Sequence, residues 1–136
     1  MSIKVKRVYK PAAAGDGLRV LVDRLWPRGL TKRAAGIDLW LREAAPSTTL
    51  RKWFGHDPGK WVGFRARYAA ELRERPDLLA ELRRKARRRG LTLLFAARDE
   101  RHNNAVALRQ MLLGPRPARL TRGRTTGGRA TRGQAR

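Results

Sequence analysis

The sequence contains no cysteine among its 136 residues and only two histidines. Without cysteine the chain can form no disulfide, has no thiolate nucleophile and offers no sulfur ligand to a metal. It also lacks a run of the roughly 18–20 apolar residues that a membrane-spanning helix needs. Its first residues lack the apolar stretch of a signal peptide. We therefore expect a cytoplasmic protein without thiol chemistry and without contact with a membrane.

Acidic side chains are scarce, because 11 Asp and Glu residues stand against 33 Lys and Arg residues, for a net charge of +22. Residues 115–136 contain seven arginines and no acid, and residues 1–114 carry the remaining +15. Either part is basic enough to bind a polyanion. Arginine outnumbers lysine 26 to 7, which codon usage in a GC-rich genome would also produce. Composition alone leaves a functional and a compositional origin of the charge both open.

The chain divides into one folded domain and a tail. The length fits a single domain, and residues 1–114 contain all of the four Trp, three Phe and two Tyr residues. In residues 115–136, Leu120 and a few alanines are the only apolar side chains besides proline. They cannot offset the entropy lost on ordering the chain. We predict a domain over 1–114 and a disordered, arginine-rich tail over 115–136.

Three segments have the pattern of β-strands. Residues 3–9 begin with apolar residues alternating with lysines, whereas 18–23 and 91–97 contain the nearly continuous apolar runs of buried strands. The link between the first two segments is too short for a parallel crossover, so they are either antiparallel or not neighbours. The chain between 18–23 and 91–97 is long enough for a right-handed crossover, which makes these two strands parallel. The segment 91–97 is expected at the centre of the sheet.

Helical patterns and capping residues fill the remaining chain. The first predicted helix covers 37–45, and the second runs from Ser47 or Thr48 to Trp53 and ends at Gly55. Asp57-Pro58 opens the third, which has an apolar stripe of Trp61, Phe64, Tyr68 and Leu72. The fourth runs from Pro76 to Gly90, and the last from Asn103 or Asn104 to Gly114. The sequence therefore predicts an α/β fold, with a small mixed, largely parallel sheet flanked by helices.

Polar residues follow the two strands that are predicted to be parallel. Asp23, Arg24 and Arg28 come after the first of them, and Arg98, Asp99 and His102 come after the second. The carboxyl ends of parallel strands meet at one edge of the sheet, where open α/β sheets bind ligands. The last helix presents its N-terminus, a favourable place for an anion, to the same edge. We therefore expect a ligand site there.

The residue types at this edge suit an anionic ligand such as a phosphate ester, a carboxylate or a nucleotide. We assign anion binding to Arg24, Arg28, Arg51 and Asn103, because a guanidinium offers a planar pair of donors that matches such groups. The candidate catalytic residues are Asp23, Asp99 and His102, with the carboxylates as base or as partners of the arginines and the histidine as acid. Whether a reaction takes place stays open.

Each of these residues also has a structural interpretation. Asp23 and Arg24 can form an ordinary ion pair at a strand end, Trp26 can cover the core, and Asn103 can cap a helix. His56 can support the cap of the helix that follows it. Two histidines without a cysteine do not indicate a metal site, and no glycine-rich phosphate loop or Gly-x-Ser-x-Gly motif occurs. No cofactor is indicated, and the oligomeric state is not encoded in these patterns.

A second hypothesis is association with nucleic acid. Its candidate residues are Arg84, Arg87 and Arg88 in the helix that ends at Gly90, together with Arg122 and Arg124 in the tail. The alternative for the helix is a solvated basic face whose cations favour the helix C-terminus. A third hypothesis is a partner-binding scaffold in which the same motifs serve stability alone.

Several motifs follow one another in order between about residue 3 and residue 113. They are VDRLWPRG at 22–29, APS at 45–47, LRKWFGH at 50–56 and LTLLFAA at 91–97, followed by NNA at 103–105. In these motifs the chain resembles the YeaO-like branch of domain of unknown function 488. The resemblance implies a small cytoplasmic bacterial α/β protein without an established reaction. In more distant branches a Cys and a Glu are expected near the end of the last strand; here Ala96 and Ala97 stand there, so a thiol-based reaction is not carried over.

Overall fold

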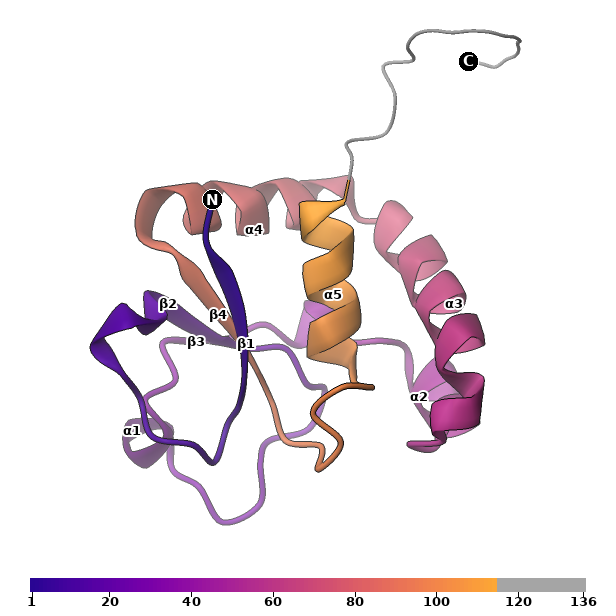
Figure 1. Ribbon diagram of the computed structural model, residues 1–136, viewed down its shortest axis with the longest axis horizontal. Helices are drawn as coiled ribbons and strands as arrows, with labels where there is room; N and C mark the ends of the chain where they lie inside the picture. The colour runs from indigo at the N-terminus through magenta and orange to yellow at the C-terminus, as the bar shows by residue number, and fades with distance from the viewer. Residues whose placement is uncertain (115–136) are drawn as a thin grey trace, which may run out of the picture.

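Four short strands form one sheet, and helices pack against its faces (Figure 1). The computed structural model describes residues 1–114. In chain order the elements are β1 (Ile3–Arg7), the 3₁₀ helix η1 (Ala14–Asp16), β2 (Leu18–Leu21), α1 (Lys32–Ala35), β3 (Leu39–Trp40), η2 (Arg42–Ala44), α2 (Thr48–Phe54), η3 (Pro58–Lys60), α3 (Trp61–Arg73), α4 (Pro76–Arg89), β4 (Leu91–Phe95) and α5 (Asn104–Leu113). The predicted α/β class is confirmed.

The strands lie in the order β1-β4-β2-β3, and each of the three pairings is parallel. Strand β4 lies between β1 and β2, so that Leu93 is in register with both Val5 and Val20. Every residue of β4 is buried, as expected for a strand with a neighbour on each side and a covered face above and below. The predictions that this strand is central and parallel to β2, and that β1 and β2 are not antiparallel neighbours, are confirmed.

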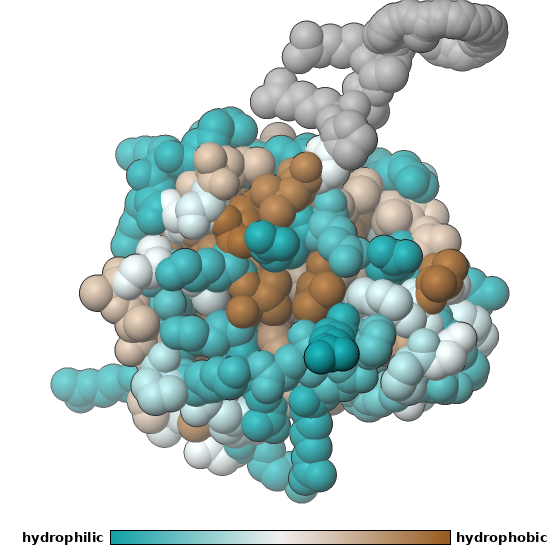
Figure 2. All heavy atoms as spheres, viewed as in Figure 1, coloured by the Kyte–Doolittle hydropathy of each residue, from teal (hydrophilic) through white to brown (hydrophobic). Residues whose placement is uncertain are grey.

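One face of the sheet carries the main hydrophobic core. Leu93 packs there with Tyr68 of α3, Leu82 of α4 and Leu108 of α5. The buried Tyr68 hydroxyl donates a hydrogen bond to the Ala44 carbonyl, so burial of this ring leaves no polar group without a partner. On the side seen in Figure 1, hydrophobic residues reach the surface mainly between β1 and α5, and hydrophilic residues surround them (Figure 2).

The other face carries a smaller core beside α1. Val8, Leu21 and Leu94 pack there with Ala35 and Ile37. The side chains of this face come from strand positions that alternate with those of the main core, as the period of two in a strand requires. The sheet is therefore covered on both sides at its carboxyl edge, where the candidate site lies.

Helix boundaries follow the capping residues that the sequence indicated. The Ser47 hydroxyl accepts a hydrogen bond from the Leu50 amide at the start of α2, and Gly55 ends this helix in the left-handed conformation at φ 54°. Asp57 Oδ1 accepts a hydrogen bond from the Gly59 amide at the start of η3. Gly90 follows α4. These local signals are confirmed because each satisfies a backbone group that a helix end would otherwise leave free.

The predicted helix over 37–45 is wrong. This segment forms β3 and η2 instead, with Leu39 in register with Val20 of β2. Leu39 packs on the main core and Trp40 on the smaller core, so consecutive residues face opposite sides of the sheet. Pairing with β2 overrides the helical pattern, because it packs the half-buried side chains of Leu39 and Trp40 against the two cores. The short helix α1 was not predicted; Thr31 caps it by accepting a hydrogen bond from the Ala34 amide.

Within residues 1–114, none of the helices has the length and apolar character needed to cross a membrane.

Candidate functional site

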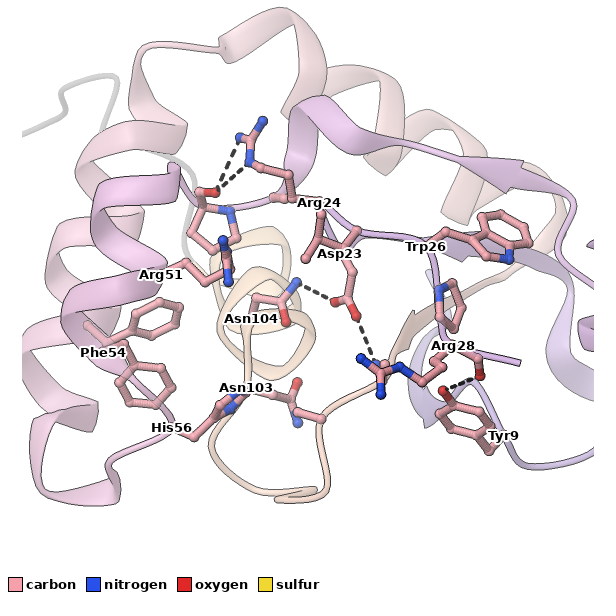
Figure 3. Close-up of a pocket in the computed structure, with 17 residues that line it drawn as sticks. Tyr9, Asp23, Arg24, Trp26, Arg28, Arg51, Phe54, His56, Asn103 and Asn104 are labelled. Carbon is pink, nitrogen blue, oxygen red and sulfur yellow. Dashed lines mark hydrogen bonds between the residues drawn. The ribbon is translucent and has the colours of Figure 1, made fainter. Parts of the chain in front are cut away.

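A cavity of about 330 Å³ opens at the carboxyl ends of β2 and β4 (Figure 3). The chain after β2 lines one side of it, the start of α5 lines another, and α2 with the residues that follow it lines a third. The side chains that bear on its chemistry are Tyr9, Asp23, Arg24, Trp26, Arg28, Arg51, Phe54, His56, Phe64, Asn103 and Asn104. The predicted position of the site agrees with the place of this cavity, while the roles assigned to its residues stay predictions.

Asp23 is the carboxylate of the cavity. Its Oδ2 accepts a hydrogen bond from the Ala96 amide at 2.9 Å, and its Oδ1 accepts one from the Asn104 side-chain amide at 3.1 Å. The same Asn104 nitrogen donates to the Val22 carbonyl at 2.8 Å, so Asn104 joins the end of β2 to the start of α5. Burial raises the pKa of Asp23, and these hydrogen bonds together with the charge of His56 offset the rise only in part.

The three arginines of the cavity form no ion pair within residues 1–114. Arg24 Nε and Nη2 both donate to the Pro46 carbonyl at 3.3 Å, which holds its side chain against the α2 side of the cavity. Arg28 and Arg51 are exposed. The ion pair between Asp23 and Arg24 that the sequence allowed does not form. The positive charge around the cavity therefore exceeds the negative charge.

His56 and Tyr9 line this cavity, although neither was predicted at the site from the sequence. His56 has φ 59°, a left-handed backbone conformation that is uncommon outside glycine. Asp57, not His56, supplies the helix cap. The Tyr9 hydroxyl donates to the Arg28 carbonyl at 2.9 Å, which ties the end of β1 to the loop after β2. In the sequence, His56 was marked only by its position between the end of α2 at Gly55 and the cap of η3 at Asp57.

Asp99 and His102 form a pair outside this cavity. His102 Nδ1 lies 2.9 Å from Asp99 Oδ2, and the histidine ring contacts Trp61 edge-on with the centroids 5.3 Å apart. The pKa of Asp99 lies below its usual range because the Arg101 amide and His102 donate hydrogen bonds to it. Asp99 lines an adjoining, more open cavity together with Arg98, whereas His102 lines neither. The structure therefore separates His102 from Asp23.

Two residues of the predicted site also have structural partners. Asn103 Oδ1 accepts a hydrogen bond from the Val106 amide as the N-cap of α5, and its Nδ2 donates to the Asp99 carbonyl. Trp26 Nε1 donates to the Leu30 carbonyl at 2.6 Å, and its ring contacts the smaller core. Both side chains are fixed by these hydrogen bonds and also line the cavity. They therefore form part of its wall.

The residues assigned to nucleic-acid binding lie elsewhere. Arg84, Arg87 and Arg88 belong to α4. This helix leads into the first residue of β4, so it ends at the amino edge of the sheet, opposite the cavity. Arg122 and Arg124 lie outside the described residues. Within residues 1–114, no group of three or more His, Asp or Glu side chains is close enough together to hold a metal ion.

Replacing Asp23 with Asn is expected to remove a buried charge that opposes folding at neutral pH. Because burial raises the pKa of Asp23 above 3.8, the carboxyl contributes stability at low pH, and this contribution is lost as the pH rises through the raised pKa. Relative to the variant, the wild-type free energy of unfolding should fall as the pH is raised from about 4 towards neutral, as measured by urea unfolding. A difference that stays constant over this range would show that burial does not raise the pKa of Asp23.

Comparison with known sequences points to one family. The model of a family described as the inactive DUF488-N3 subclade matches residues 2–124. The uncharacterized protein YeaO of Escherichia coli is 43% identical over 112 residues, which are 82% of this chain and 97% of that protein. The uncharacterized proteins Mb3100c of Mycobacterium bovis and Rv3073c of Mycobacterium tuberculosis are each 39% identical over 112 residues, covering 82% of this chain and 94% of theirs. No solved structure matches significantly.

Proposed function

Because the chain belongs to the DUF488 family, as a relative of YeaO within a subclade described as inactive, we propose that it binds a small anionic molecule without transforming it. The ligand is phosphate-bearing, a nucleotide or a related anion, and it occupies the cavity at the carboxyl ends of β2 and β4. The observation that carries this proposal is that Arg24, Arg28 and Arg51 surround one cavity and pair with no carboxylate among residues 1–114.

The electrostatics of the cavity favour an anion. A guanidinium without a carboxylate partner keeps its charge available to an anionic ligand, and its planar pair of donors matches phosphate and carboxylate oxygens. Asn103 and Asn104 bring the N-terminal end of α5 to the same cavity, where the helix dipole adds a partial positive charge. Asp23 supplies the one carboxylate among the residues that line the cavity. Burial raises its pKa, which favours the neutral form.

The walls of the cavity suit a ligand with an apolar or aromatic part. Phe54 and Phe64 stack on each other with their centroids 4.3 Å apart, and both line the cavity together with Trp26. The cavity volume of about 330 Å³ lies near the lower end of the range for small-molecule sites. A mostly apolar wall with a few charged groups is the usual composition of such a site.

The same residues argue for binding without turnover. Asp23 is held by the Ala96 amide and by Asn104, and His102 is turned to Asp99 outside the cavity. Ala96 and Ala97 line the cavity at the place where the family resemblance puts a Cys and a Glu in more distant branches. Alanine offers neither a nucleophile nor a proton. These features agree with membership of a subclade described as inactive.

Replacing Arg28 with Gln is expected to weaken anion binding about tenfold or more, because a hydrogen bond to a charged group contributes roughly 1.5–3 kcal/mol. The measurement is calorimetric titration of the full chain with phosphate, sulfate and adenosine monophosphate at low ionic strength. The matched control is Arg33→Gln, which removes the same charge from an exposed residue of α1 that does not line the cavity.

Equal losses in the two variants would mean that only the overall charge attracts the anion, and the cavity would then not be a binding site. A lower thermal stability of Arg28→Gln with unchanged affinity would instead favour the scaffold hypothesis. Hydrolysis or other conversion of the nucleotide by the wild type, lost in Asp23→Asn, would contradict binding without turnover.

A further inference from the structure

A second cavity adjoins the first one at the carboxyl edge of the sheet. It has a volume of about 840 Å³ and is more open to solvent. Four residues line both cavities, namely Tyr9, His56, Ala96 and Ala97, and we name them the common wall. Because the two cavities meet along the common wall, one ligand can contact both.

The common wall does not close the first cavity off from the second. Ala96 and Ala97 carry only a methyl group each, so no long side chain separates the cavities there. Tyr9 and His56 lie on opposite sides of the first cavity in Figure 3. We propose that the ligand spans both cavities and is a nucleotide with two phosphate groups, the second of which binds to Arg7 and Arg98. This inference rests on the proposed function, which places one anionic group in the first cavity.

Arg7 is fixed at the common wall. Its Nε donates hydrogen bonds to the Ala97 carbonyl at 3.1 Å and to the Ala96 carbonyl at 3.4 Å. Its Cζ lies 4.9 Å from the centroid of the Tyr9 ring. Within residues 1–114 these contacts use Nε and the face of the guanidinium, which leaves both Nη groups to an anion. A side chain that is already held in place loses little conformational freedom when it binds a ligand.

Arg98 adds a second cation to this cavity, and the carboxylate of the cavity pairs with neither arginine. Arg98 is exposed and forms no ion pair within residues 1–114. Asp99 Oδ1 accepts hydrogen bonds from the Arg101 and His102 amides at 2.9 and 3.0 Å, and its Oδ2 lies 2.9 Å from His102 Nδ1. Two arginines against one carboxylate leave the second cavity positively charged.

The composition of the two cavities indicates which part of the ligand each one holds. Phe54, Phe64 and Trp26 line the first, whereas among the described residues the second has no aromatic ring beyond the common wall. The ring of a nucleotide therefore suits the first cavity. That cavity, of about 330 Å³, is small for a ligand site, so a further group extends into its neighbour. Guanidinium donors match phosphate oxygens, and a nucleoside 3′,5′-bisphosphate has this chemistry.

The test is calorimetric titration of the full chain, at low ionic strength, with adenosine 3′,5′-bisphosphate and with adenosine 5′-monophosphate. The wild type is expected to bind the bisphosphate roughly 10- to 100-fold more tightly, because each hydrogen bond between charged groups contributes about tenfold or more. Arg98→Gln should lower this ratio of affinities about tenfold. Arg28→Gln, which changes the first cavity, should weaken the binding of both nucleotides and keep the ratio.

The matched control is Arg101→Gln. Arg101 is exposed, lies close to Arg98 in the chain and lines neither cavity. A chain with a net charge of +22 attracts the bisphosphate more strongly than the monophosphate wherever it binds. The control removes the same charge without removing the proposed contact, so it should keep the wild-type ratio. Thermal unfolding of both variants should match the wild type, because neither arginine forms an ion pair within residues 1–114.

The outcomes separate this inference from the proposed function. A ratio that falls equally in Arg98→Gln and Arg101→Gln would overturn the inference, because net charge would explain the preference. A wild-type ratio near one, with monophosphate binding still dependent on Arg28, would overturn it and leave the proposed function intact. Absence of binding of either nucleotide would overturn both. Fructose 1,6-bisphosphate, which has two phosphate groups and no aromatic ring, should bind more weakly than the bisphosphate nucleotide, and equal or tighter binding would contradict a nucleotide ligand.

Discussion

Asp16→Asn is expected to lower the free energy of unfolding by about 3–5 kcal/mol, because it leaves the guanidinium of Arg19 buried without its counter-charge. The side chains of Asp16 and Arg19 are 2% and 5% exposed. An exposed ion pair of the same kind contributes about 1 kcal/mol or less. Burial therefore makes this substitution one of the most damaging single changes that the fold offers. For a domain of this size the expected fall in Tm is more than about 10 °C.

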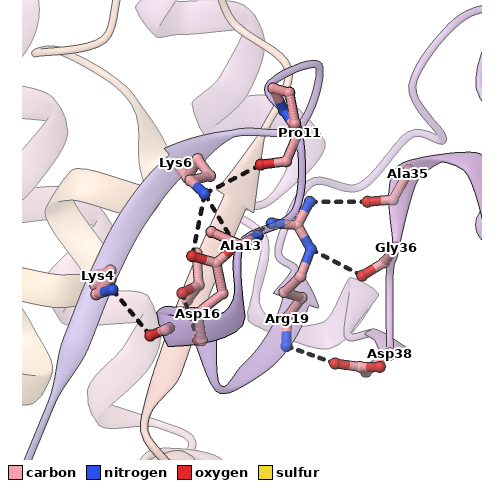
Figure 4. A network of polar contacts seen from close by, with 11 residues as sticks. Lys4, Lys6, Pro11, Ala13, Asp16, Arg19, Ala35, Gly36 and Asp38 are labelled. Atoms are coloured by element: carbon pink, nitrogen blue, oxygen red, sulfur yellow. Dashed lines mark hydrogen bonds and ion pairs between the residues drawn. The ribbon is translucent and has the colours of Figure 1, made fainter.

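The network around Asp16 ties a long loop to the sheet (Figure 4). Arg19 of β2 donates to Asp16 and to the carbonyls of Ala35 and Gly36, both at 2.8 Å. Lys6 Nζ of β1 donates to both oxygens of Asp16, at 3.0 and 2.9 Å. The strands β1 and β2 are not neighbours, so this carboxylate joins them across the face of β4.

The effect of Asp16→Asn should become smaller in acid. Burial alone would raise the pKa of Asp16, but the hydrogen bonds from Lys6, from the Ala13 amide and from Arg19 outweigh it and lower the pKa from 3.8 to about 2. A lowered pKa gives stability that is present above the unfolded value and is lost as the pH falls through the folded value. The gap between wild type and variant should therefore narrow by about 2 kcal/mol between about pH 4 and pH 2.

The matched control is Glu100→Gln, which breaks the ion pair between Glu100 and Lys10. Their nitrogen and oxygen atoms lie 2.8 Å apart, but the two side chains are about half exposed, so a loss of about 1 kcal/mol or less is expected. Urea unfolding of both variants from neutral to acid pH measures the two effects. Equal small losses in the two variants would mean that burial of the Asp16 carboxylate does not strengthen its pairing with Arg19.

Much of the fold could be predicted from local sequence. Continuous apolar residues identified β4 as the central strand, and Ser47, Asp57 and Gly90 marked helix ends that the structure has. These signals are local because a cap satisfies backbone groups a few residues away. The strand β3 could not be predicted, because two residues give no period and their pairing with β2 depends on a contact between separate segments.

The candidate site could be placed but not completed from the sequence. Parallel strands put Asp23 and Ala96 at one edge, and that inference needed only the order of the elements. His56 could not be found in this way, because it reaches the cavity through a left-handed backbone turn. His102 follows β4 closely in sequence, but its ring turns to Asp99 and Trp61, which position along the chain does not indicate.

The two edges of the sheet differ in what they do for the molecule. At the amino edge, charged groups are buried and paired, as in Asp16 with Arg19, and they contribute stability. At the carboxyl edge, Arg28 and Arg51 form no ion pair within the described residues, and Asp23 carries a burial penalty. A buried charge without an ion-pair partner, such as that of Asp23, costs stability, and groups of this kind are typical of binding sites. Substitutions at the two edges should therefore separate stability from ligand affinity.

Gly17→Ala is expected to destabilise the domain by about 2–5 kcal/mol, through two additive causes. Gly17 has φ 65° and ψ −141°, a conformation that residues with a Cβ rarely adopt, at a cost of about 1–2 kcal/mol. A Cβ at this position would also lie 2.5 Å from the Gly90 carbonyl oxygen and 2.6 Å from that of Arg89. Both are backbone atoms at the entry to β4, so the chain itself would have to move, which adds about 1–3 kcal/mol.

Gly29→Ala separates these two causes. Gly29 has φ 80°, but a Cβ there would meet no atom within 4 Å, so only the conformational cost of about 1–2 kcal/mol applies. Gly17 begins the close approach of β2 to β4, where the Leu18 amide donates to the Gly90 carbonyl at 3.0 Å. Displacing this carbonyl weakens the central pairing of the sheet as well. Thermal and urea unfolding of the two variants side by side measures the difference. Equal losses of unfolding free energy in the two variants would mean that the backbone at Gly90 moves away from the added Cβ at no energetic cost. The amino edge would then be less tightly packed than the structure has it.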